Sequence, residues 1–239
     1  MATTTLLQGP TRARRTTVWM KILMASTGAL FVFYVLMHMY GNLKLFFGQA
    51  AFDEYAHHLR EILTPILPYE GFLWLFRALM IVALGLHAYA AFTLWVRANG
   101  ARPQRYAVRS AAKGASRSTW MRWGGVALLL FVVFHLVQFT ISKLNFNPNV
   151  TAAKIGTSPY QLVVASFQLW WVVLIYVLAL IALGLHLFHG VWSGAQTLGW
   201  TTSPGARAIA KLTAHLVAGV VVVGFALPPL AILAGIVKA

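Results

Sequence analysis

The chain has 239 residues, of which 59% are hydrophobic and only 10% are charged. Soluble domains contain about 25% charged residues, so this composition excludes an ordinary soluble protein and favours one polytopic membrane domain over residues 1–239. There are 19 Lys and Arg residues, 4 Asp and Glu residues and no cysteine. Without cysteine the chain has no disulfide, thiolate metal site or iron–sulfur ligand, so the eight histidines are the candidate soft-metal ligands.

Long apolar runs predict five membrane-spanning helices and therefore an all-α bundle. We expect these spans at residues 19–40, 72–96, 120–141, 165–192 and 208–236. The first is too long for the apolar core of a signal peptide, so we expect it to be retained. Pro228 and Pro229 fall near the end of the fifth span and predict a kink or break in its last turns.

The segment between the first two spans has its own pattern. Apolar residues recur at three- and four-residue spacing from Phe52 to Ile66, which predicts a short amphipathic helix on the membrane surface. Asp53 and Glu54 are expected in its first turn, where the helix dipole favours anions. His57 and His58 fit solvated surface histidines better than metal ligands.

Charge orients the bundle. All four acids, Asp53, Glu54, Glu61 and Glu70, lie in the loop between the first two spans. Most basic residues lie in three segments on the opposite side: Arg12, Arg14, Arg15, Lys21, Arg97, Arg102, Arg105, Arg109, Lys113, Arg117, Arg122, Arg207 and Lys211. The positive-inside rule then predicts a cytoplasmic N-terminus and an external C-terminus, and it explains the basic excess without nucleic acid.

An internal repeat links four of the spans. Residues 83–87 and 182–186 both read Ala-Leu-Gly-Leu-His, ending at His87 and His186. The first and third spans match more loosely, and there His38 and His135 are offset by nearly the same distance along the chain. This pattern predicts a two-helix unit used twice in parallel orientation, with the fifth span outside the repeat.

Depth pairs the same histidines. The helical rise places His38 and His135 roughly 18–28 Å from the cytoplasmic ends of their spans, and His87 and His186 roughly 9–18 Å. Two imidazoles from opposed helices at one depth suit the axial positions of a haem iron. We therefore expect two b haems, an outer one on His38 and His135 and an inner one on His87 and His186. The alternative is that each histidine only hydrogen-bonds a neighbouring helix.

Other residues are secondary candidates. His189 competes with His186 for the inner site but lies outside the repeated pentapeptide, and His215 is expected to pack or to contact a haem propionate. Glycines in the spans would let a macrocycle approach the backbone: Gly28, Gly85, Gly124, Gly125 and Gly184. Weaker candidates for propionate or quinone contacts are Ser26, Thr27, Asn42, Lys44, Trp120 and Arg122.

These features together resemble a known family. The five spans, the four histidines and the string from His186 through Gly190 to Trp192 and Ser193 are similar to the di-haem, cytochrome b558-type membrane anchor of succinate dehydrogenase and related fumarate reductases. The resemblance implies the same ligand assignment. It also implies a flavoprotein and an iron–sulfur subunit as cytoplasmic partners, and electron delivery to a membrane quinone, menaquinone rather than ubiquinone.

The resemblance places the chain in a bacterial plasma membrane, and the oligomeric state of the complex stays open, including a higher oligomer. Some fumarate reductases of this family carry a glutamate two residues before the fourth-span ligand, where this chain has Gly184. We therefore expect succinate oxidation without that carboxylate proton path. Three alternatives remain: a bis-histidine anchor of a formate dehydrogenase or hydrogenase, a haem-free transporter with a histidine relay, and a purely structural anchor.

Overall fold

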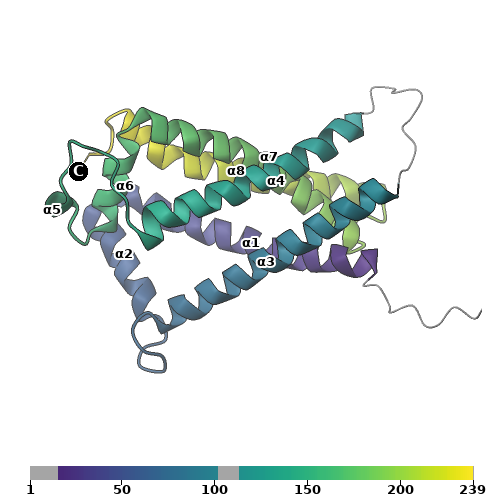
Figure 1. The fold of residues 1–239 in the computed structure, drawn as a ribbon, viewed down its shortest axis with the longest axis horizontal. Coiled ribbons are helices and arrows are strands. Elements are labelled where there is room, and N and C mark those ends of the chain that lie inside the picture. Colours follow the sequence, from purple (N-terminus) through teal and green to yellow (C-terminus); the bar gives the residue numbers. More distant parts are fainter. Residues whose placement is uncertain (1–15, 102–112, 239) are drawn as a thin grey trace, which may run out of the picture.

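The computed structural model describes residues 16–101 and 113–238, and of residues 113–119 the backbone only. The described residues are all helical or irregular and contain no strand (Figure 1). Five helical segments are long and apolar enough to cross a membrane: Thr17–Phe47, Gly71–Gly100, Trp120–Ile141, Trp170–Thr197 and Pro204–Leu233. The chain is therefore an all-α, multi-pass membrane protein, as the apolar runs predict.

Two of the spanning helices begin after a residue whose side chain satisfies a free backbone N–H group. α1 (Thr17–Leu43) starts after Thr16, whose side chain accepts from the Trp19 N–H. α8 (Pro204–Leu233) starts after Ser203 with a proline in its first turn, where the missing N–H costs nothing. The other spanning helices are α3 (Gly71–Gly100), α4 (Lys113–Leu136), continued by the π-helical turn η2 (Val137–Ile141), and α7 (Trp170–Thr197).

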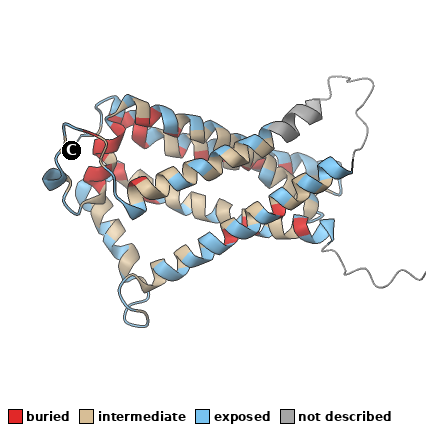
Figure 2. Cartoon of the chain, viewed as in Figure 1, coloured by how far each residue is buried: buried red, intermediate tan, exposed pale blue. Residues whose placement is uncertain are grey.

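Four spanning helices form two packed pairs, α1 with α3 and α4 with α7. α1 also packs on α7, which joins the pairs, and α8 lies along α7 and touches α1 (Figure 1). Buried residues concentrate at one end of the bundle, where α6 (Pro159–Phe167) meets α7 and α8 (Figure 2). Large apolar side chains elsewhere on the spans are exposed, as expected of surfaces that face lipid.

That end is closed by short elements: η1 (Lys44–Phe47), α2 (Gln49–Glu61), α5 (Ala152–Ile155) and α6. The predicted helix is present as α2, but it ends at Glu61 rather than continuing to Ile66, and the expectation that Asp53 and Glu54 lie in its first turn is wrong. α2 starts at Gln49, after Gly48, whose positive φ of 90° is one that glycine adopts readily. The Asp53 carboxylate instead accepts from the Tyr160 N–H at 3.0 Å and the Ser158 hydroxyl at 2.6 Å, so it holds the start of α6.

Two span boundaries also differ from expectation. Residue 165 belongs to α6, because the helix is interrupted at Gln168 and Leu169 and α7 starts only at Trp170. α8 runs through Pro228 and Pro229 to Leu233, so the predicted break does not occur. Both prolines are buried and lie in the last two turns of α8. The backbone hydrogen bonds that they cannot donate are therefore lost near the end of the helix, where few helical residues follow.

Several cytoplasmic-side cations assigned from the sequence lie outside the described residues: Arg12, Arg14, Arg15, Arg102, Arg105 and Arg109. Lys113 and Arg117 are described by their backbone alone.

Candidate histidine-pair site

The structure places two histidine pairs inside the bundle, each built from two spanning helices. His38 on α1 and His135 on α4 form the outer pair, with ring centroids 5.8 Å apart and planes at 80°. His87 on α3 and His186 on α7 form the inner pair, at 6.2 Å and 56°. These are the partners that depth and the repeat favour.

Aromatic rings surround the outer pair. Tyr34, one helical turn before His38, stacks on its imidazole at 5.5 Å and 11°. Phe131, one turn before His135, stacks on that imidazole at 5.9 Å and 29°. Phe225 from α8 lies 5.6 Å from His38 and closes the pair on the side of the fifth span. The outer imidazoles are thereby held in an apolar, ring-lined environment.

A hydrogen-bonded chain fixes the orientation of His135. The Tyr176 hydroxyl on α7 donates to Gln138 Oε1 at 2.9 Å and lies 3.0 Å from His135 Nδ1. Because its proton is directed to Gln138, the Tyr176 oxygen accepts from an Nδ1–H of His135. This leaves the Nε2 lone pair of His135 available to a ligand. Gln138 is fully buried, and its Nε2 finds no hydrogen-bond partner among the described residues.

Threonine serves the inner pair in the same way. The Thr27 hydroxyl donates to the Leu23 carbonyl at 2.8 Å and lies 3.0 Å from His87 Nδ1. Its oxygen therefore accepts from His87 Nδ1–H, and the Nε2 of His87 keeps its lone pair. His186 Nδ1 is buried and has no partner in the part of the chain that the structure describes.

Two glycines give the inner histidines their space. A Cβ at Gly28 on α1 would lie 3.6 Å from His87 Cε1, and one at Gly125 on α4 would lie 3.7 Å from His186 Cε1. A methyl group could just be accommodated at these distances, but any longer side chain would reach the imidazole.

The donor set fits a haem iron bound from two sides. Two imidazoles that bind one metal from opposite sides, with nitrogens about 2 Å from it, have ring centroids about 6 Å apart. Both pairs match that separation. No cluster of three or more metal-ligating side chains occurs in the described ranges, so a tetrahedral protein site of the zinc type does not fit. The unpartnered Nε2 of Gln138 and Nδ1 of His186 also indicate that these pockets are completed by another group.

Of the weaker candidates, the structure brings two to the pairs. Thr27 binds His87 as described, and Asn42 Nδ2 donates to the His38 carbonyl at 2.8 Å and lies 3.4 Å from His38 Nε2. The 3.4 Å contact is long for a hydrogen bond, so it would yield readily to a metal on that lone pair. Ser26 is exposed and Lys44 packs on the Tyr40 ring, away from the pairs.

The remaining candidates lie at the end of the bundle away from α6, on α7 or on α8. Trp120 is 70% exposed, and Arg122 donates to Asn99 Oδ1 at 3.2 Å. His215 Nδ1 bonds the Lys211 carbonyl in its own helix, and its ring packs 4.4 Å from Phe188, which makes it a packing residue. His189 lies one turn after His186 on α7.

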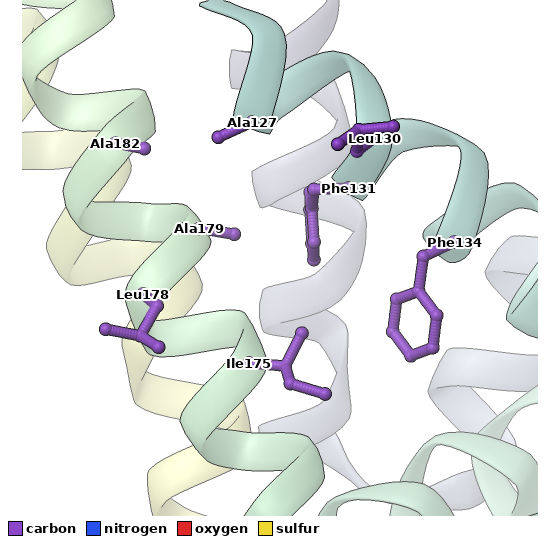
Figure 3. A pocket seen from close by; sticks show the side chains of 8 residues that line it. All are labelled: Ala127, Leu130, Phe131, Phe134, Ile175, Leu178, Ala179 and Ala182. Atoms are coloured by element: carbon purple, nitrogen blue, oxygen red, sulfur yellow. The ribbon is translucent and has the colours of Figure 1, made fainter. Parts of the chain in front are cut away.

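An apolar groove of about 370 Å³ lies between α4 and α7 (Figure 3). Its lining residues are Ala127, Leu130, Phe131, Phe134, Ile175, Leu178, Ala179 and Ala182. Phe131, which lines the groove, also stacks on the His135 imidazole. The lining has no polar side chain that could bind a quinone carbonyl, so the groove is suited to a hydrocarbon chain rather than to a quinone ring.

Three residues near the pairs carry no motif that marks them in the sequence. Gln138 lies three residues from His135, so a search for hydrogen-bonding groups within two turns of a histidine finds it, whereas Tyr176 lies ten residues from the nearest histidine of its own span and is not found. Arg77 is charged within α3, and its guanidinium lies over the Trp74 ring at 4.8 Å. Its charge alone was the available signal, because a cation inside a span is costly unless it has a role or reaches the interface.

Comparisons with protein-family models, with curated proteins and with solved structures find no significant match to this chain. The functional argument therefore rests on the histidine pairs and their surroundings.

Proposed function

We propose that this chain is the di-haem cytochrome b anchor subunit of a succinate:quinone oxidoreductase in a bacterial plasma membrane. The observation that carries the proposal is the presence of two histidine pairs, each from two spanning helices and each with the ring separation of a bis-imidazole metal site. In this proposal His38 and His135 bind the outer haem iron, and His87 and His186 bind the inner one. A bound b haem supplies reversible one-electron transfer within the membrane.

The protein's own contribution is to present neutral imidazoles in the required tautomer. Thr27 and Tyr176 accept from the Nδ1–H groups of His87 and His135, which directs each Nε2 lone pair toward a metal. The rings of Tyr34, Phe131 and Phe225 exclude water around the outer pair. Low polarity around both pairs favours tight axial ligation and electron transfer over exchange of ligands with water.

The two packed helix pairs support a parallel repeat. α1 with α3 and α4 with α7 each contribute one outer and one inner histidine. With the acidic loop outside and the basic segments inside, the N-terminus is cytoplasmic and the inner pair lies nearer the cytoplasm.

Charge supports cytoplasmic partners. Because all four acidic residues lie in the external loop, the cations Arg97, Arg122 and Lys211 have no carboxylate side chain of this chain on their side of the membrane. They bond neutral groups or lie on aromatic rings instead. In the proposal this surface docks the iron–sulfur subunit, which receives electrons from the flavoprotein that oxidises succinate. Electrons leave the haems to a quinone, menaquinone in preference to ubiquinone.

Visible spectroscopy of the purified chain tests the class of protein. We expect a reduced-minus-oxidised spectrum with a b-type α band and two haems per chain by haemochrome assay. A chain purified from haem-replete cells without that band would overturn the proposal and favour the histidine-relay transporter.

Substrate reduction tests the choice of dehydrogenase. In membranes that contain the assembled complex, succinate is expected to reduce the haems, and malonate, a competitive analogue of succinate, is expected to block this. Haems that are reduced by formate or hydrogen but not by succinate would assign the chain to another respiratory dehydrogenase.

A further inference from the structure

The hydrogen bonds among His135, Tyr176 and Gln138 support an inference that rests on the proposed haem function and extends it. We propose that Tyr176 and Gln138 are positioning residues that lock His135 as its Nδ1–H tautomer and thereby lower the reduction potential of the outer haem. Neither residue touches the iron in this proposal; both act through His135.

The tautomer is a real choice in this environment. A neutral imidazole carries one N–H, on either Nδ1 or Nε2, and only the Nδ1–H form offers Nε2 to a metal. Within a membrane an N–H without an acceptor is costly, so the form that finds an acceptor is selected. Tyr176 Oη, 3.0 Å from His135 Nδ1, is that acceptor, because its own proton is directed to Gln138 Oε1 at 2.9 Å.

Gln138 determines the direction of the two hydrogen bonds that link it through Tyr176 to His135. If its amide did not accept from Tyr176, the phenol could donate to Nδ1 instead and would select the Nε2–H form, which cannot bind iron through Nε2. Gln138 is completely buried and lies in the π-helical turn η2, three residues after His135. Such turns often mark functional sites. Successive hydrogen bonds also polarise one another, so the bond to Gln138 strengthens the acceptor that His135 meets.

The effect on the iron follows from ligand basicity. A hydrogen bond from Nδ1–H to an acceptor makes the imidazole a stronger donor through Nε2, which stabilises ferric over ferrous iron. Removing the acceptor should therefore raise the outer haem potential. The inner haem, whose ligand His87 bonds Thr27, should not respond.

The test is Tyr176→Phe, compared with the unaltered chain by redox titration and by low-temperature electron paramagnetic resonance of the ferric haems. We expect both haems to remain and one to shift its reduction equilibrium about tenfold toward the ferrous form, or 59 mV for one electron. In a His87→Ala background, where only the outer haem should remain, the same shift is expected in the single titration step.

Tyr160→Phe is the matched control. Tyr160 is also a buried tyrosine, and its hydroxyl donates to the Lys238 carbonyl at 3.0 Å, but it lies in α6 and not beside a histidine pair. It should leave both potentials and both ferric signals unchanged. Gln138→Met keeps side-chain length but cannot accept from Tyr176 as an amide does, and we expect it to shift the outer haem in the same direction.

The outcomes separate the two proposals. Two haems with unmoved potentials in Tyr176→Phe, or a shift in the inner haem only, overturn this inference and leave the proposed function standing. If Tyr176→Phe loses the outer haem, Gln138→Met decides: an unshifted outer haem overturns the inference. The absence of any b-type band in the unaltered chain overturns both. Nitrogen NMR of histidine-labelled, haem-free chain gives a measurement independent of haem, with His135 as Nδ1–H in the unaltered chain and as a mixture of tautomers in Tyr176→Phe.

Discussion

His38 and His135 lie among aromatic rings, whereas His87 and His186 lie against glycine backbone. The two pairs have nearly the same ring separation, so the difference is in what holds them. Stacked rings and a buried phenol–amide chain hold the outer pair. The inner pair has fewer such contacts: Thr27 bonds His87, the Phe31 ring meets His87 edge-on at 5.8 Å, and Gly28 and Gly125 lie beside the two imidazoles.

Symmetry differs between the pairs as well. Gly28 and Gly125 are offset along the chain as His38 and His135 are, and each faces one inner histidine. The inner site therefore keeps the relation between the two halves of the repeat. At the outer site Tyr176 and Phe225 each contact only one of the two histidines, so the relation is broken there. The fifth span, α8, contributes most to this difference, because it packs mainly along α7, in the second half of the repeat.

Substitution of single histidines should have the largest effect, because each is expected to remove one of the two haems. His38→Ala and His135→Ala are each expected to remove the outer haem and keep the inner one, and His87→Ala and His186→Ala the reverse, because a low-spin haem needs both axial ligands. Haem content per chain and potentiometric titration measure this. His215→Ala is the control and should retain two haems, since His215 bonds its own helix. If His87→Ala and His186→Ala both left two haems, the pairing would be wrong.

Glycine substitution should break the inner site selectively. Gly125→Leu places a branched side chain against His186, where a Cβ alone already comes within 3.7 Å, so the inner haem should be lost or bound more weakly by about 1–3 kcal/mol. Gly124→Leu is the matched control, because a Cβ there meets no atom within 4 Å among the described residues. Haem content and the α band report the result. Equal losses in both variants would show that bulk anywhere on this turn is harmful and that Gly125 has no special role.

The packing of α8 against α7, which has no equivalent at Gly85, can be tested by measuring the free energy of unfolding. A Cβ at Gly184 would lie 2.7 Å from Val222 Cγ2, whereas one at the repeat-equivalent Gly85 meets nothing within 4 Å in the described structure. Gly184→Ala should therefore lower the free energy of unfolding by about 1–3 kcal/mol through overpacking, while Gly85→Ala should not. Thermal unfolding in detergent measures both. Val222→Ala should restore the stability of Gly184→Ala, and failure of that rescue would exclude the α7–α8 contact as the cause.

Much of this architecture could be predicted from sequence because its signals are periodic or repeated. Apolar runs locate the five spans, and the repeat selects the histidines that the structure brings together. The separate helix α6 could not be predicted, because its apolar residues run directly into α7 and the break at Gln168 and Leu169 contains only one polar residue. The role of Tyr176 could not be predicted from the sequence either. Its role depends on a contact between helices, and a single tyrosine in an apolar span has no distinctive spacing.

Thr27→Val should give the smallest effect and completes the comparison between the pairs. Valine keeps the shape of threonine but removes the oxygen that accepts from His87 Nδ1–H at 3.0 Å. The inner haem potential should rise, as the outer one does in Tyr176→Phe. The rise should be smaller, because the backbone carbonyl of Met24 also hydrogen-bonds His87 and can accept its proton when the Thr27 oxygen is lost. A lost hydrogen bond of about 1 kcal/mol corresponds to roughly 40 mV for one electron. Thr27→Ser should retain the unaltered potential, since it keeps the oxygen. A shift in Thr27→Ser as large as in Thr27→Val would mean that packing at α1, and not acceptance of the Nδ1 proton, sets the inner potential.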